Sequence, residues 1–265
     1  MEYIHFIDSD DWLELECIEK CIQKALNSQA EIVWHNWNRV TDGISGDFSF
    51  PTLLDELKLN SNKVYTGEDI FSYLNDDNFS WTVMGIIKSN ICYEIRFAEE
   101  IEGEDAIFGT ITFAKSRRIA IIMEKIYHYR IRPYSVSQYT LNDIVSTSRL
   151  CLPPHQAYLE DFFSNVHIAR YYRFSYSSAV ICVRLKIFSD IIGDSSLKKV
   201  IDRMIIKRSY YMFYYKIFDK DPKNIQSIVV ELQDYIKYMP LKVKFLYYFP
   251  RCYKIIKKLF YKTNY

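Results

Sequence analysis

The sequence predicts an α/β protein in which a mixed sheet with covering helices is followed by an α-helical C-terminal region. Short runs rich in β-branched and aromatic residues alternate with segments of helical period over the first half of the chain. Beyond Pro153, hydrophobic residues recur at helical spacing through long segments. Of the 265 residues, 49% are apolar, which is enough to bury a large core and excludes a disordered chain.

The first elements predict a β-α-β unit. Residues 3–7 form a short apolar and aromatic run that stops at a group of carboxylates, as a buried strand does when its carboxyl end carries charge. Apolar residues then recur at helical spacing over 14–27, and residues 31–37 predict a second buried strand. Ligands of open α/β sheets bind at such strand ends, so the carboxylates mark a candidate site.

Three more elements complete the predicted sheet-containing half. Before them, residues 38–63 lack periodicity and hold Gly, Pro, Asp, Asn and Ser, which indicates an irregular excursion over the surface. The run Thr66-Gly67-Glu68-Asp69 has capping-box spacing and predicts a helix through Leu74. A further helix is expected over 103–116, and a strand over 119–123.

The second half of the chain is predicted to be helical. We divide the chain into a domain of residues 1–150 and a helical region of residues 151–265. The sequence Cys151-Leu152-Pro153-Pro154 fits the linker, because a residue before proline is pushed out of the helical region. The expected amphipathic segments are approximately 156–192, 195–218 and 222–238.

Composition and cysteine usage favour a cytoplasmic protein. The formal net charge of +1 and the lack of an RNA-binding signature argue against a nucleic-acid partner. Six cysteines are scattered without a CxxC pair and no secretory signal opens the chain, which indicates a reducing compartment. The longest runs free of charged residues are short of the roughly 20 residues that span a bilayer, so no transmembrane helix is predicted.

Cys17 and Cys21 are interpreted as core residues. They stand one helical turn apart, but the sequence places no histidine or further cysteine near them at ligand spacing. His5 and His35 likewise show no metal-ligand spacing. Because free cysteine is among the most buried residue types, packing is the expected role of both thiols.

The strongest chemical signal is an acidic run after the first predicted strand. Asp8, Asp10 and Asp11 place three carboxylates within four residues, and their mutual repulsion favours a cation beside them. Mg²⁺ and Mn²⁺ prefer oxygen ligands and commonly bind through one or two carboxylates plus substrate phosphates. The other interpretation is that these are turn and cap residues, with Asp11 capping the next helix.

The run Phe6-Ile7-Asp8-Ser9-Asp10-Asp11-Trp12, followed by a helix and Ala30-Glu31-Ile32-Val33, resembles the DxD segment of bacterial family 2 glycosyltransferases of the GT-A type. The resemblance implies that residues 1–150 form a partial GT-A, Rossmann-like sheet. In that family the DxD aspartates hold a metal ion and the diphosphate of the sugar donor. Asp8 and Asp10 would therefore bind the donor and Mn²⁺ or Mg²⁺, with Asp11 as a supporting metal ligand.

A second segment, Gly103-Glu104-Asp105-Ala106-Ile107-Phe108, resembles the Glu-Asp motif of the same family. The resemblance implies that Asp105 is the general base of an inverting transfer, with Glu104 beside it in the catalytic pair. A positioned carboxylate that takes the proton of an attacking hydroxyl contributes about 10²- to 10⁴-fold in rate. The alternative is that the two carboxylates only stabilise a helix N-terminus through its dipole.

Two weaker segments extend the resemblance. Residues 79–88 are similar to a tryptophan-containing stretch of surface-polysaccharide transferases, in which Trp81 would stack on the acceptor sugar; packing in the core is the alternative. Residues 126–137 are similar to a basic family segment, expected here on one loop. His128 and Arg130 would neutralise the donor diphosphate or complete the metal shell, whereas a solvated basic strand end is the alternative.

The last segment, residues 240–265, interleaves lysines with aliphatic and aromatic residues. This composition suits a basic amphipathic helix on an anionic membrane surface, where each basic residue contributes about 1 kcal/mol. A helix packed on its own domain with its lysines outward is the alternative. The first interpretation implies a peripheral protein at the inner face of the cell membrane.

Taken with the resemblance, these features predict metal-assisted, inverting transfer of a hexose or N-acetylhexosamine from a nucleotide diphosphate sugar, expected to be a UDP-sugar. The acceptor would be a capsule polysaccharide or lipooligosaccharide glycan, free or lipid-linked. Family members normally begin with a nucleotide-binding half, whereas this chain begins at the DxD strand. Three explanations of the missing half are a late start assignment, a second chain that supplies it, and a decayed product. The rival hypothesis is a non-catalytic, membrane-associated fragment or partner subunit.

Overall fold

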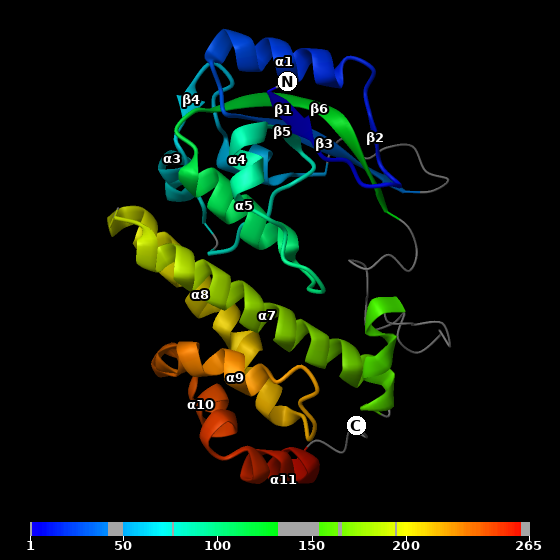
Figure 1. The fold of residues 1–265 in the computed structure, drawn as a ribbon, viewed down its shortest axis with the longest axis vertical. Helices are drawn as coiled ribbons and strands as arrows, with labels where there is room; N and C mark the ends of the chain where they lie inside the picture. The colour runs from blue at the N-terminus through cyan, green and yellow to red at the C-terminus, as the bar shows by residue number, and fades with distance from the viewer. Residues whose placement is uncertain are drawn as a thin grey trace. The chain divides into compact units, whose positions relative to one another are not determined.

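The computed structural model describes residues 2–41, 50–75, 77–131, 154–163, 166–193 and 195–260. The chain forms two compact units. The first comprises Met1–Phe97 and Phe108–Arg149, and the second comprises Ala98–Ile107 and Leu150–Tyr265. The predicted mixed α/β half and helical C-terminal region are confirmed (Figure 1). The grouping of Ala98–Ile107 with the helices was not foreseen, because it depends on contacts with residues far along the chain.

The first unit is built on a mixed sheet, and its elements follow in chain order. They are β1 (Tyr3–His5), β2 (Trp12–Leu13), α1 (Cys17–Ser28), β3 (Ile32–Thr41), α2 (Leu53–Leu57), β4 (Val64–Tyr65), α3 (Gly67–Ser72), β5 (Gly85–Lys88), α4 (Ser89–Glu94) and β6 (Ile119–Ile131). Helix α5 (Glu104–Lys115) begins in the second unit and continues into the first.

The sheet has the strand order β1-β5-β3-β6-β2, and β4 also pairs with β6. Strands β3 and β6 are parallel, and the other pairs are antiparallel. Strand β5 therefore lies between the two strands of the predicted β-α-β unit, and β1 lies at one edge of the described sheet. Helix α1 covers one face of this sheet, and α3 and α5 lie on the other (Figure 1).

Helix α1 packs through a stripe of small side chains. Cys17, Cys21 and Ala25 are fully buried at successive turns of the helix. They pack with Val33 of β3 and Ile126 of β6 in one hydrophobic cluster. The burial expected for both cysteines is confirmed, because an i, i+4, i+8 stripe faces the sheet. The apolar spacing of Leu15, Ile18, Ile22 and Ala25 predicts a different buried face, and that prediction is wrong for Leu15 and Ile18, which are exposed.

Two strands are longer than the local pattern predicts. Strand β6 continues from the expected 119–123 to Ile131, and β3 continues to Thr41, into a segment interpreted as irregular. The two run in parallel from Ile32 and Ile119 to their ends, with register shifts at Asn36. Each strand supplies the hydrogen-bonding partner of the other, and that long-range support is invisible to a local sequence window. The predicted irregular segment also contains the short helix α2.

The capping box expected at Thr66 is present at the start of α3. The Asp69 N–H donates to Thr66 Oγ1 (3.1 Å), and the Thr66 N–H donates to Asp69 Oδ2 (2.8 Å). These bonds lower the pKa of Asp69, so their contribution to stability is present above the ordinary aspartate pKa and is lost as the pH falls through the lowered value.

The Thr66→Ala substitution is expected to lower the free energy of unfolding by about 1 kcal/mol, because Thr66 is exposed and acts only through its cap. The Thr66→Ser variant keeps the hydroxyl and should unfold at the same urea concentration as the parent. Chemical denaturation monitored by circular dichroism checks both. Equal losses in the two variants would contradict the capping role.

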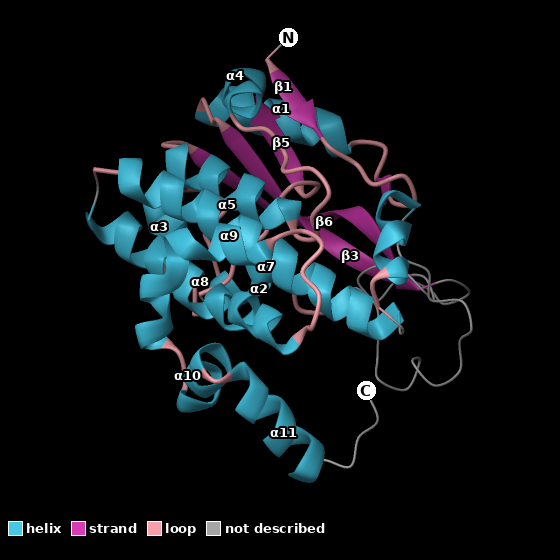
Figure 2. Cartoon of the chain, turned by 60° about the horizontal axis from the view of Figure 1, so that its bottom comes forward, coloured by secondary structure: helices cyan, strands magenta, loops and turns pink. Residues whose placement is uncertain are grey.

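The second unit is helical in its described residues, and every strand in Figure 2 belongs to the first unit. Helices α7 and α8 form its longest pair, and their facing side chains Ile181 and Ile205 are fully buried. The elements are η1 (Pro154–Asp161), α7 (Val166–Ile191), α8 (Ser195–Phe213), η2 (Tyr214–Ile217), α9 (Ile225–Val229), η3 (Val230–Tyr238), α10 (Leu241–Tyr248) and α11 (Pro250–Phe260).

The predicted basic tail forms two helices in place of one. Helix α10 ends at Tyr248 and α11 begins at Pro250, because proline suits the first turn of a helix but cannot donate within one. Residues 261–265 of the predicted segment lie outside the described residues. Among the described helices, none combines the length and the apolar character that crossing a bilayer requires.

Candidate functional site

The acidic run forms a turn that follows β1. The Asp11 N–H donates to the carbonyl of Asp8 at 3.2 Å and closes this turn. Asp8 is exposed, whereas Asp10 and Asp11 are half-buried. The strand therefore delivers three carboxylates to one short loop at its carboxyl end, as the sequence predicted.

Asp11 fastens this loop to β6. The Tyr127 hydroxyl donates to Asp11 Oδ2, and the Arg130 N–H donates to Asp11 Oδ1 at 2.8 Å. The Asp8 N–H in turn donates to the Tyr127 hydroxyl at 3.5 Å. Burial, followed by the Asp11 carboxylate, raises the pKa of Tyr127, so the phenol keeps its proton and remains a donor.

The alternative role of Asp11 as a helix cap is wrong. Helix α1 has Glu16 at its N-cap position, with no side-chain cap bond. Both Asp11 oxygens are instead engaged by β6, which orients the carboxylate. Asp8 and Asp10 are then the carboxylates that the anchored loop presents.

The Tyr127→Phe substitution tests this anchor. It removes the donor to Asp11 Oδ2 inside a buried contact, and leaving such an acceptor unsatisfied costs about 1–3 kcal/mol. We expect a loss of that size in the free energy of unfolding. Tyr93→Phe is the matched control, because Tyr93 lies exposed in α4 of the same unit. Equal stability of the two variants in urea titrations would contradict the anchor.

His128 and Arg130 lie on strand β6, and the prediction of a loop there is wrong. Both are held by pairing with other strands, as β6 runs beyond its predicted end. His128 is buried, stacks on Trp12 with ring centroids 5.1 Å apart, and donates from Nε2 to Glu14 Oε1 at 2.7 Å. Arg130 is tied to the acidic loop through its backbone. The predicted residues 132–137 lie outside the described residues.

Trp81 packs in the core of the first unit. This position does not support the expectation that it stacks on an acceptor sugar. Its side chain is only 2% exposed, and its ring contacts that of Phe113 at 5.1 Å. Its Nε1 donates to the carbonyl of Met84 at 3.3 Å. A Cβ on Gly109 would meet the Trp81 backbone at 2.5 Å, so α5 approaches it closely. No open ring face is left for a sugar.

Glu104 and Asp105 begin α5, as the sequence predicted, within the part of the chain that belongs to the second unit. Glu104 is exposed and Asp105 is half-buried. Burial raises the pKa of Asp105, the charge of Glu104 raises it further, and Arg208 opposes both. A carboxylate with a raised pKa is a better proton acceptor at neutral pH, so the environment of Asp105 suits a general base.

One group of ligand-type side chains was missed by sequence reasoning. His5, Cys17 and His35 come together in the first unit from β1, α1 and β3. They stand 12 and 18 positions apart in the sequence, so they form no local metal-binding motif. One feature of the sequence could have indicated this group: Cys17 lies on the buried stripe of a helix that covers two strands, and each of these strands carries a histidine.

Comparison with known proteins gives one relative by sequence and several likenesses by structure. No family model matches the chain. Glycosyltransferase GlyA of Streptococcus pneumoniae serotype 4 is 28% identical over 142 residues. The match covers 51% of this chain and 20% of that protein, so the matched region spans about a fifth of the relative. This relative agrees with the resemblance to glycosyltransferases in the sequence.

The structures that the chain is similar to include two complexes of S. aureus TarS 1–349. The complex with UDP-GlcNAc has a TM-score of 0.48 and 15% identity, covering 96% of this chain and 65% of that one. The complex with UDP has a TM-score of 0.48 and 13% identity, covering 100% of this chain and 68% of that one.

Proposed function

We propose that this chain takes part in glycosyl transfer from a nucleotide diphosphate sugar, with the Asp8–Asp11 loop binding the donor. The observation that carries the proposal is the anchoring of this loop. Its third carboxylate is held by two donors from β6, so the loop presents Asp8 and Asp10 at the end of a strand. The similarity to GlyA supports the same class of reaction.

The donor site would use a hard divalent cation. Asp8 and Asp10 would hold Mn²⁺ or Mg²⁺ together with the diphosphate oxygens, with Asp11 as a supporting ligand. The residues fit such an ion, because they supply carboxylate oxygens on a loop that is partly exposed. When bound, the ion would neutralise charge on the leaving diphosphate. Arg130 lies beside this loop on β6 and would add a positive charge there, whereas His128 acts through packing on Trp12.

The transfer itself would invert the anomeric centre of the donor sugar. Asp105 takes the proton of the acceptor hydroxyl as the hydroxyl oxygen bonds to the anomeric carbon. The bond from that carbon to the diphosphate oxygen breaks, and its electron pair leaves with the diphosphate. Glu104 raises the proton affinity of Asp105 through its charge. A hexose or N-acetylhexosamine carried by UDP is the donor we propose.

We place the reaction at the inner face of a cell membrane, with a surface-polysaccharide or lipooligosaccharide acceptor. Leu241 of α10, Ile255 of α11 and Phe249 between the two helices are exposed to solvent, and basic residues alternate with these apolar ones. That combination supports contact with an anionic lipid surface. Lys254 is engaged in an ion pair with Asp219, so the contact would rest on the other lysines of the segment.

We also propose that a second polypeptide supplies nucleotide-binding strands to this chain. Strand β1 lies at the edge of the described sheet, and an edge strand presents backbone groups that can pair with another strand.

Isothermal titration of the 265-residue chain with UDP-sugars in the presence of Mn²⁺ tests the proposal. We expect heat of binding that requires the metal and that is lost in the Asp8→Asn variant. Absence of heat with every nucleotide sugar, from protein that is folded by circular dichroism, would favour a non-catalytic fragment or partner subunit.

A further inference from the structure

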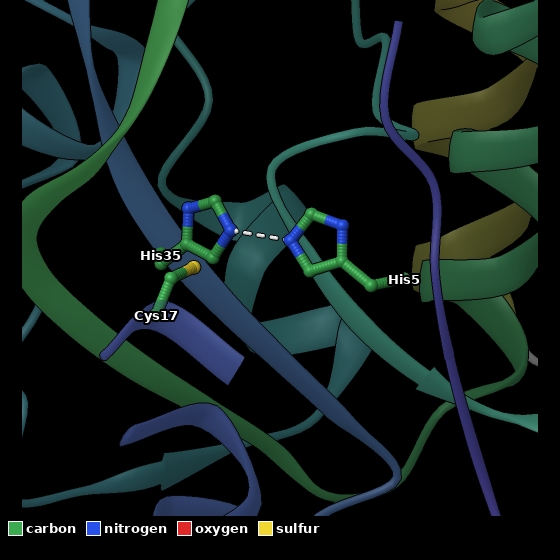
Figure 3. Close-up of side chains that lie close together, drawn as sticks. All are labelled: His5, Cys17 and His35. Carbon is green, nitrogen blue, oxygen red and sulfur yellow. Dashed lines mark hydrogen bonds between the residues drawn. The ribbon is translucent and has the colours of Figure 1, made fainter. Parts of the chain in front are cut away.

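Three side chains of metal-ligand type converge between β1, α1 and β3 (Figure 3). The nitrogen and sulfur atoms that His5, Cys17 and His35 offer lie within 4.8 Å of one another. The two imidazoles stack with ring centroids 5.3 Å apart, and their Nε2 atoms face each other at 3.0 Å. Cys17 and His35 are fully buried.

The hydrogen bonds of the two imidazoles determine where their protons lie. His5 Nδ1 contacts the carbonyl of Phe6 at 2.6 Å, and His35 Nδ1 contacts the carbonyl of Asn36 at 3.1 Å. A carbonyl oxygen only accepts, so both Nδ1 atoms must carry hydrogen. In the neutral rings both Nε2 atoms then present lone pairs, which point at each other across 3.0 Å. That arrangement is unfavourable unless a positive charge relieves it.

A bound cation accounts for all of these contacts together. Metal-ligating histidines characteristically donate their other ring N–H to a backbone carbonyl, which fixes the tautomer and aims the remaining nitrogen at the metal. Both His5 and His35 have this arrangement. Cys17 lies beside these nitrogens, and its sulfur is within 4.8 Å of the ligand atoms of both histidines. The thiolate is the form of cysteine that binds metal.

We propose that His5, Cys17 and His35 form a binding site for a transition metal, with Zn²⁺ as its natural occupant. Two nitrogens and one thiolate suit zinc, with bonds of about 2.0–2.1 Å to nitrogen and about 2.3 Å to sulfur. A tetrahedral ion would separate the two nitrogens by about 3.3 Å and each nitrogen from the sulfur by about 3.6 Å. Shifts of up to about 1 Å therefore bring the three ligands into position.

This site is distinct from the carboxylate site of the proposed function. It offers nitrogen and sulfur from side chains of which Cys17 and His35 are fully buried, whereas Asp8 and Asp10 offer oxygen on a loop. His5 ends β1 and Cys17 begins α1, so one ion bound to both would close the intervening segment, which contains the aspartates. His35 would tie the closed segment to β3. The ion would hold the short edge strand β1 to α1 and to β3, and water would take the fourth position of the tetrahedron.

Cobalt substitution tests the proposal on the 265-residue chain after treatment with a chelator. We expect one Co²⁺ per chain, a thiolate-to-cobalt charge-transfer band in the near ultraviolet, and displacement by one equivalent of Zn²⁺. Binding should also raise the melting temperature, because the metal binds only the folded chain. The Cys17→Ser variant should lose the charge-transfer band, and His35→Gln should weaken binding by at least about tenfold.

The controls separate this site from other cysteines and from the aspartate loop. Cys92→Ser and Cys21→Ser should keep the band and the stoichiometry, because neither thiol is among the three proposed ligands. Asp10→Asn should also keep the band, so failure of the proposed donor site does not imitate failure of this one. Absence of stoichiometric metal from chain that is folded by circular dichroism would overturn the proposal. Persistence of the band in Cys17→Ser would also overturn it.

Discussion

Replacing Asp10 with asparagine is expected to remove Mn²⁺-dependent donor binding and to lower the rate of sugar transfer by about 10²- to 10³-fold. That range is typical of removing one preorganised group that faces charge developing in the transition state. Asparagine keeps the size of the side chain but loses the negative charge that the cation requires. Because Asp10 lies on a loop anchored through Asp11, the fold should be unaffected.

Two matched variants make this result specific to charge in the acidic loop. Ser9 lies between the aspartates on the same exposed turn, so the Ser9→Ala variant should retain both donor binding and turnover. Asp11→Asn should instead lower thermal stability, because its carboxylate accepts hydrogen bonds from Tyr127 and Arg130. Titration calorimetry with a UDP-sugar and Mn²⁺, with and without EDTA, measures the binding. Retention of metal-dependent heat by Asp10→Asn would remove this aspartate from the donor site.

The elements that could be predicted from sequence are those specified by local chemistry. The burial of Cys17 and Cys21 on α1 and the Thr66 capping box each depend on residues within a few turns of one another. The lengths of β3 and β6 depend instead on their pairing with each other, between residues about 90 positions apart. The insertion of β5 between β1 and β3 likewise depends on long-range pairing, and no local pattern indicates it.

The same distinction applies to the candidate site. Asp8 and Asp10 could be identified because acidic residues that follow a strand are a local signal. The role of Asp11 could not, since its partner Tyr127 lies 116 positions away and was interpreted only as part of a basic segment. The burial of Trp81 depends on its contact with α5. The convergence of His5, Cys17 and His35 needs three elements to meet, and the helical spacing that predicts burial of Cys17 does not indicate the two histidines beside it.

Replacing Asp105 with asparagine is expected to lower kcat by about 10²- to 10⁴-fold with little change in KM for the donor, because a general base acts in the transition state. The base works only when it is deprotonated. Its pKa is raised by burial and by Glu104, so the rate of the parent enzyme should fall as the pH drops through that raised value. The Asp105→Asn variant should lose this acidic limb of the pH profile.

The Glu104→Gln variant distinguishes two roles of Asp105. In one, Asp105 is a general base whose pKa is raised by Glu104; in the other, its carboxylate only interacts favourably with the helix dipole. Removing the charge of Glu104 lowers the pKa of Asp105, so the acidic limb should move to lower pH while the plateau rate changes little. Stability gives an independent readout. When folding raises the pKa of a carboxyl group, the folded state becomes less stable as the pH rises through that raised value. The Asp105→Asn variant should therefore have a higher free energy of unfolding at neutral pH. A variant that is less stable than the parent, and that keeps the acidic limb, would assign Asp105 to helix capping alone.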